Sequence, residues 1–101
     1  MDIRPPTTQS KNLLKEIRLC LEKGHYNFSK HALKRMSERK ADLQDVIHVL
    51  KNGHYDQTKD TWDNKYQTWN YSIVGTSVDQ KKLRIVVNID ESFMIVVTVI
   101  R

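Results

Sequence analysis

The stretch KLRIVVNIDESFMIVVTVI, residues 82–100, decides the fold class of this chain of 101 residues. Over its first half, alternate positions carry the apolar residues Leu83, Ile85, Val87 and Ile89. This alternation predicts a strand with one buried face. Residues 93–100 are rich in β-branched side chains and apolar on both faces, which is typical of a strand in the middle of a sheet. The polar residues 90–92 between them predict a hairpin turn.

Upstream of this hairpin, the spacing of apolar residues changes at Gly53. Residues 65–74 alternate loosely and predict another strand, whereas residues 54–63 fit either an early strand or a mobile loop. Before Gly53 the spacing is helical. The expected helices run from Ser10 to Lys23 with Gly24 as the stop, over 30–39 with Ser29 as the N-cap, and from the N-cap Asp42 to Gly53. Helices followed by strands predict an α+β fold with an antiparallel sheet of about four strands.

The length and composition predict one domain over residues 10–101, preceded by a polar, proline-containing lead-in over residues 1–9. The apolar runs are too short to span a membrane, and the N-terminus has no apolar signal segment, so we expect a cytoplasmic protein without a membrane partner. The single cysteine, Cys20, excludes an internal disulfide. Its place on the apolar side of the first helix predicts that it is buried.

The positive charge of the chain, +5 in total, is concentrated in its first part. Residues 1–40 carry ten Lys and Arg against four Asp and Glu, whereas residues 41–101 carry seven against eight. A basic segment attached to a near-neutral body favours a polyanionic partner, of which nucleic acid is the commonest. A solvated basic helix face is the other interpretation of the same pattern.

The segment SKHALKRMSER, residues 29–39, places His31, Arg35 and Arg39 four residues apart. On a helix these side chains form one slanted stripe that borders the apolar face. Guanidinium groups bind phosphate in a bidentate geometry, and an imidazole moves a proton near neutral pH. The stripe therefore fits RNA cleavage by the RNA's own 2′-hydroxyl, with no metal or other cofactor. A structural or solvated role for these three residues is the alternative.

The predicted strands add candidates on a second wall. Arg84 is out of phase with the apolar residues of its strand, and Thr98 is the polar residue of an otherwise apolar strand. A polar side chain in an inner strand needs a partner such as a phosphate oxygen or an arginine, and the other interpretation is that Thr98 is simply a good strand former. The aromatic residues between positions 62 and 71 fit either base stacking or packing of the sheet. We favour packing, with Trp62 as the most exposed of them. The remaining histidines lack companions at metal-ligand spacing, so we expect no metal site.

The segment FSKHALKRMSER, residues 28–39, resembles the opening motif of an uncharacterised family of small bacterial proteins. That motif is a strand ending in Phe-Ser, then His-Ala, then two arginines four residues apart. The strand segments 83–87 and 97–99 match the closing strands of the family. The family looks like the RelE/ParE/BrnT-like group of toxin ribonucleases and is often encoded beside MqsA-type antitoxins.

This resemblance implies helices packed on a curved antiparallel sheet and metal-independent RNA cleavage between them. It implies a toxin of a type II toxin-antitoxin system, with RNA and a cognate antitoxin as partners, the candidate antitoxin being an MqsA-like protein. The catalytic residues that follow from the match are His31, Arg35 and Arg39, and the phosphate- or RNA-binding residues are Arg84, Thr98, Lys30 and Lys34. A non-catalytic binding module of the same fold, and a ParE-like toxin that acts on a protein target, are the alternatives.

Overall fold

The computed structural model describes residues 9–90 and 92–101, so the expected lead-in lies, apart from Gln9, outside the described residues. Three α-helices come first along the chain, and most of the strands follow them. The elements are α1 (Leu13–Lys23), β1 (Tyr26–Phe28), α2 (Lys30–Arg39), α3 (Leu43–Asn52), β2 (His54–Tyr55), the 3-10 helix η1 (Gln57–Lys59), β3 (Thr61–Asp63), β4 (Thr68–Thr76), β5 (Lys82–Asp90) and β6 (Phe93–Ile100). The predicted α+β class is confirmed.

The strands form one six-stranded mixed sheet in the order β1-β6-β5-β4-β2, with β3 paired to β4. The prediction of about four antiparallel strands is wrong in two respects, because the sheet has six strands and β1 runs parallel to β6. β1 is the strand ending at Phe28 that the family motif implies, but its pairing with the far end of the chain leaves no local signal in the sequence. β6 lies between β1 and β5, which confirms that it is an inner strand.

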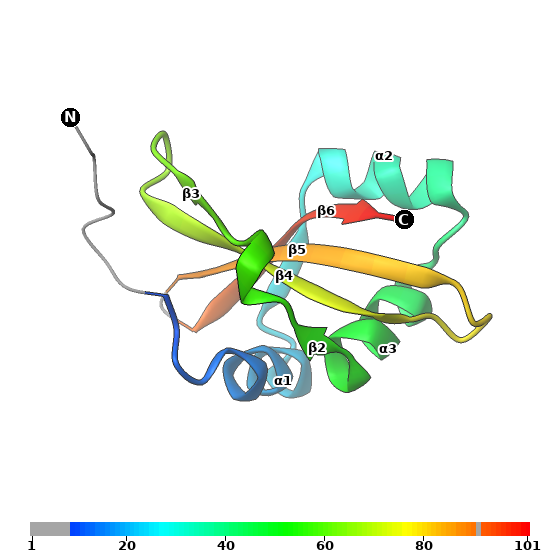
Figure 1. Cartoon of the computed structure of the whole chain (residues 1–101), viewed down its shortest axis with the longest axis horizontal. Helices are drawn as coiled ribbons and strands as arrows, with labels where there is room; N and C mark the ends of the chain where they lie inside the picture. The colour runs from blue at the N-terminus through cyan, green and yellow to red at the C-terminus, as the bar shows by residue number, and fades with distance from the viewer. Residues whose placement is uncertain (1–8, 91) are drawn as a thin grey trace.

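One apolar core joins the helices to the sheet. Figure 1 shows α1 and α3 below the strands, and α2 above them beside the end of β6. The fully buried side chains of this core include Ile17 from α1, Val46, Val49 and Leu50 from α3, and Ile73, Ile85, Val87, Met94, Val96 and Val99 from the sheet. The face of the sheet that points away from α1 and α3 is less completely covered, and the polar residues of β4 and β5 lie on this face. Within the described part of the chain, no helix is long and apolar enough to cross a membrane.

Capping residues set the ends of the helices largely as expected. Ser29 and Asp42 cap α2 and α3, and Gly24 ends α1 in the left-handed conformation with φ of 71°. The predicted start of α1 at Ser10 is wrong, because the N-cap is Asn12 and its side chain makes no capping hydrogen bond. Ser10 instead donates its hydroxyl to Glu16 at 2.7 Å and its amide N–H to the Tyr71 hydroxyl at 3.0 Å.

Residues 54–63, left open between strand and loop, form β2, η1 and β3 along the edge of β4. Gly53 makes the tight passage from α3 into β2 possible. A Cβ at this position would lie 2.6 Å from the carbonyl oxygens of both Val49 and Val74. Only a residue without a side chain allows the end of α3 to approach β4 this closely.

Candidate nucleic-acid interface

Helix α2 carries most of the predicted site, and its first turn is tied to β6. The Ser29 hydroxyl accepts a hydrogen bond from the Ala32 amide at 2.9 Å and donates one to the Val97 carbonyl at 2.8 Å. The Ser29 amide donates to the Val96 carbonyl at 3.0 Å. With Ala32 and Met36 buried beneath it, the helix is held at a fixed rotation about its axis. The side chains of the stripe therefore sit on a rigid support.

The stripe His31, Arg35 and Arg39 becomes more buried toward the end of α2. His31 is exposed, whereas Arg35 and Arg39 are partly buried. Arg35 donates to Glu38 at 3.1 Å, which is the one ion pair in the described part of the chain. Two members of the stripe, His31 and Arg39, are thus left without a carboxylate partner among the described residues. Lys30 and Lys34 are exposed on the same helix.

Arg39 differs from a solvated surface arginine. Its Nε atom is buried and has no hydrogen-bond partner in the described part of the chain. Buried N–H groups in folded proteins are nearly always paired, and leaving one unpaired costs about 1–3 kcal/mol. The guanidinium therefore has an unused donor, while Arg39 as a whole stays partly exposed.

The sheet brings Arg84 and Thr98 onto one face. Val86 pairs with both Ser72 and Thr98, and the next row along the strands pairs Arg84 with Val74 and Ile100. The Arg84 Nη1 atom lies 3.5 Å from the Ser72 hydroxyl, a weak contact. No carboxylate among the described residues pairs with Arg84.

The same face of the sheet carries a groove of about 580 Å³. Its lining residues are Ser29, Asp63, Tyr66, Thr68, Asn70, Asn88, Asp90, Phe93, Ile95 and Val97. None of the predicted catalytic or RNA-binding residues lines this groove. Ser29 lines the groove and is the N-cap of α2, so the groove reaches the N-terminal end of the helix that carries the stripe.

Sequence reasoning missed Asn70 and Asn88 as candidates. Both are polar residues out of phase with the buried positions of their strands, which is the same signal that singled out Arg84. The Asn70 Oδ1 atom is buried and accepts no hydrogen bond from the described residues. This unused acceptor makes Asn70 a candidate ligand-binding residue.

The prediction that Trp62 is the most exposed aromatic residue is wrong. Trp62 is partly buried and packs edge-on against Trp69, with ring centroids 5.6 Å apart. Tyr66, in the turn between β3 and β4, is 68% exposed instead. Cross-strand pairing of the two tryptophans explains the difference, since Trp62 and Trp69 are register partners.

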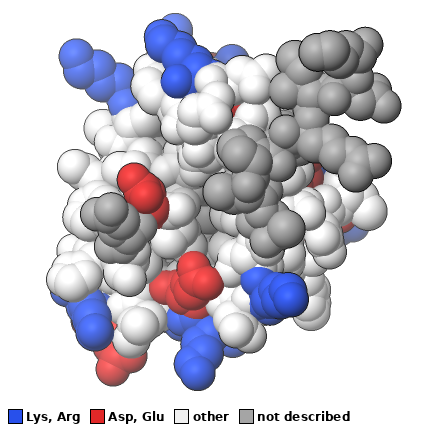
Figure 2. Space-filling view, turned by 90° about the vertical axis from the view of Figure 1, so that its left-hand side faces the viewer, with Lys and Arg blue, Asp and Glu red and all other residues white. Residues whose placement is uncertain are grey.

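The basic residues are more concentrated on the segment that contains α2 than at the end of the molecule drawn in Figure 2. Figure 2 views the left-hand end of Figure 1, where Lys and Arg side chains stand apart near the outline and Asp and Glu lie between them. By contrast, the segment 30–40 that contains α2 carries five Lys and Arg and one Glu. The local excess of positive charge thus follows the stripe.

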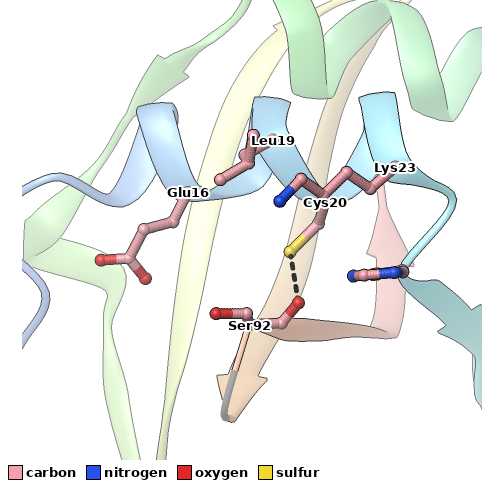
Figure 3. A pocket seen from close by; sticks show the side chains of 6 residues that line it. Glu16, Leu19, Cys20, Lys23 and Ser92 are labelled. Carbon is pink, nitrogen blue, oxygen red and sulfur yellow. Dashed lines mark hydrogen bonds between the residues drawn. The ribbon is translucent and has the colours of Figure 1, made fainter.

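A second, smaller cavity of about 150 Å³ surrounds Cys20, whose predicted burial is confirmed. Figure 3 shows the Cys20 thiol pointing at Ser92, and its Sγ atom donates to the Ser92 carbonyl oxygen at 3.4 Å. Burial, and then the negative charge of Glu16, raise the pKa of this thiol. A protonated, enclosed thiol is a poor nucleophile. Among the described residues, no three or more His, Cys, Asp or Glu side chains gather as a metal site requires.

Comparison with known families gives one finding. A family described as a domain of unknown function (DUF4258) matches residues 28–101, nearly three quarters of the chain. The match begins just before α2 and covers the stripe, the sheet face and the groove. A comparison with curated proteins gives no match. The chain therefore belongs to the DUF4258 family.

Proposed function

We propose that this member of the DUF4258 family is a metal-independent endoribonuclease and acts as the toxin of a type II toxin-antitoxin system. The observation that carries the proposal is the partly buried guanidinium of Arg39. It has an unused Nε donor and no carboxylate partner, and it lies on one helical stripe with His31. A cation in this state favours an anionic ligand, and an RNA phosphate fits its fork geometry.

In the proposed reaction the 2′-hydroxyl of the RNA attacks the adjacent phosphorus. His31 takes the hydroxyl proton, while Arg35 and Arg39 stabilise the charge that builds on the phosphorane oxygens. The bond to the 5′-oxygen breaks, and this oxygen takes a proton from a general acid. The products are a 2′,3′-cyclic phosphate and a 5′-hydroxyl, so no water is consumed in this step.

The sheet face supplies the second half of the proposed phosphate site. Arg84 and Thr98 lie in adjacent rows of that face, and Lys30 and Lys34 add positive charge along α2. A cognate antitoxin is the proposed protein partner, and an MqsA-like protein is the candidate. It would neutralise this basic surface with acidic residues of its own.

The proposal is tested by incubating the purified protein with a long single-stranded RNA in EDTA and mapping the new ends. We expect discrete cuts with 2′,3′-cyclic phosphate ends, which His31→Ala abolishes. The matched control is His54→Ala, at another exposed histidine, which should cut like the wild type. Because His31 is exposed and makes no hydrogen bond to the described residues, its loss should change the free energy of unfolding by less than about 0.5 kcal/mol. A fully active His31→Ala protein contradicts the assignment.

A second candidate function is nucleic-acid binding without chemistry. It is favoured by the same exposure of His31, since no described side chain orients the imidazole as a base is usually oriented. In that case the protein cleaves neither free RNA nor RNA on translating ribosomes. The logarithm of its affinity for RNA still falls linearly with the logarithm of the salt concentration. Intact RNA together with arrested replication in expressing cells would instead indicate a protein target.

A further inference from the structure

The groove on the sheet face is large enough for a small molecule, and its lining combines an apolar wall with polar groups. Its volume of about 580 Å³ falls within the range of about 300–1,000 Å³ that such sites occupy. The apolar part of its lining comes from β6, through Phe93, Ile95 and Val97. Its polar part comes from β4, β5 and the turn before β4.

The groove contains hydrogen-bond acceptors that the described part of the protein leaves unused. The buried Asn70 Oδ1 atom accepts no hydrogen bond, and the side chains of Asn88 and Asp90 have no hydrogen-bond partner in the described part of the chain. Asp63 is occupied differently, because its Oδ1 atom accepts from the amides of Lys65 and Tyr66 and so shapes the turn. A ligand that pairs with the Asn70 Oδ1 atom must therefore bring a hydrogen-bond donor to this place.

An exposed aromatic ring stands beside these acceptors. Tyr66 lines the groove and is 68% exposed, a large apolar surface left in water. The Lys65 ammonium lies 5.2 Å from the centroid of this ring, which adds a positive charge at the rim. This arrangement fits a flat aromatic ligand that carries an anion. The ligand ring can stack on Tyr66, and its anion can pair with Lys65.

We infer that the groove is a subsite for one unpaired nucleobase that carries an exocyclic amino group, such as adenine or cytosine. The amino group would donate to Asn70 Oδ1, Tyr66 would stack on one face of the base, and the β6 side chains would contact the other. The inference rests on the proposed function for the identity of the polyanion as RNA. Because Ser29 lines the groove and caps α2, a bound base would lie near the end of α2 that carries His31.

The test measures binding of the full chain to three labelled 2′-fluoro oligomers of adenine, cytosine or uracil by fluorescence anisotropy. The 2′-fluoro sugar lacks the attacking hydroxyl, so no cleavage intervenes. Uracil has no exocyclic amino group, and we expect it to bind about tenfold more weakly than the other two. Asn70→Leu should abolish this preference and keep the affinity for the uracil oligomer. Tyr66→Ala should weaken all three to a similar extent.

The control variant is Asn52→Leu, at an exposed asparagine at the end of α3 that lines no groove, and it should keep the preference. Equal binding of the three oligomers by a protein that still cleaves RNA overturns the subsite and leaves the proposed function in place. Unchanged preference in a folded Asn70→Leu protein, judged by its melting temperature, also overturns the subsite. Failure to bind any oligomer, with no cleavage of RNA, overturns both proposals.

Discussion

At the scale of single residues, Arg39 combines two properties that a purely structural arginine rarely shows together. Its stem is packed against the protein, yet its Nε donor has no partner among the described residues. Arg35, four residues earlier, is a different case, since Glu38 accepts its hydrogen bond at 3.1 Å. Both groups are 39% exposed, so water screens that pair and its contribution to stability is small. Because Arg35 has a carboxylate partner and Arg39 has none among the described residues, a substitution of Arg39 tests an anion site more sharply than one of Arg35.

Replacing Arg39 by methionine keeps most of the aliphatic stem and removes the unpaired donor. We expect the free energy of unfolding to stay level or rise by about 1 kcal/mol, because the cost of the unpaired N–H disappears. RNA affinity should fall about tenfold, and the salt dependence of binding should lose about one phosphate contact. Urea unfolding and anisotropy titrations over a range of salt measure the two effects.

Arg18→Met is the matched control for this prediction. Arg18 is exposed, and its Nε atom donates to the Lys51 carbonyl at 3.0 Å, so its loss should lower stability slightly and leave the salt dependence near that of the wild type. Equal losses of affinity in the two variants would show that only overall charge matters, and would remove Arg39 from the site.

At the scale of elements, sequence patterns located what is encoded locally. The caps Ser29 and Asp42 were predictable because a capping side chain bonds to an amide three residues away. The parallel pairing of β1 with β6 was not, because it depends on residues near opposite ends of the chain. The position of the stripe on one side of α2 and the outward phase of Arg84 were predictable from periodicity. The groove was not, because four separate segments form it, and the unpaired state of Asn70 depends on packing.

The N-cap of α2 offers a prediction that separates stability from function. Ser29→Ala removes the cap of α2 and the hydrogen bond to Val97, so we expect a loss of about 1–2 kcal/mol in the free energy of unfolding. Because the same bonds tie α2 to β6, RNA cleavage should fall as well, measured well below the melting temperature. Asp42→Ala removes the cap and capping box of α3, which carries no proposed RNA-binding residue. It should lose similar stability and keep its activity, so parallel losses of activity would argue against a role for the position of α2.

At the scale of the whole molecule, β2, η1 and the start of the described chain meet at one carboxylate. Asp60 accepts hydrogen bonds from the Tyr55 hydroxyl, from Gln9 at 3.1 Å and from the Ser72 amide at 3.3 Å. Burial, and then the contact with Asp60, raise the pKa of Tyr55. Burial is also the largest cause of the raised pKa of Tyr71; the hydrogen bond from the Ser10 amide opposes it, and the negative charge of Asp60 adds to it. Both phenols are thus held neutral by the fold, and this ties stability to pH on the alkaline side.

This network predicts how the stability of the protein responds to high pH. A raised folded-state pKa means that the neutral phenol stabilises the fold fully below the ordinary tyrosine pKa of about 10, and that this contribution is lost as the pH rises above it. The free energy of unfolding, measured by urea titration with far-UV circular dichroism, should therefore be level from pH 7 to 9 and fall above pH 10.

Tyr55→Phe should be about 1 kcal/mol less stable at pH 7, because it lacks the hydrogen bond to Asp60. Its free energy of unfolding should also fall less steeply above pH 10, since one of the two phenols is gone. Tyr66→Phe, at an exposed ring, is the matched control and should keep the wild-type slope. An alkaline slope that Tyr55→Phe leaves unchanged would mean that other groups unfold the protein at high pH, and that the Asp60 network does not couple β2 and β4 to protonation.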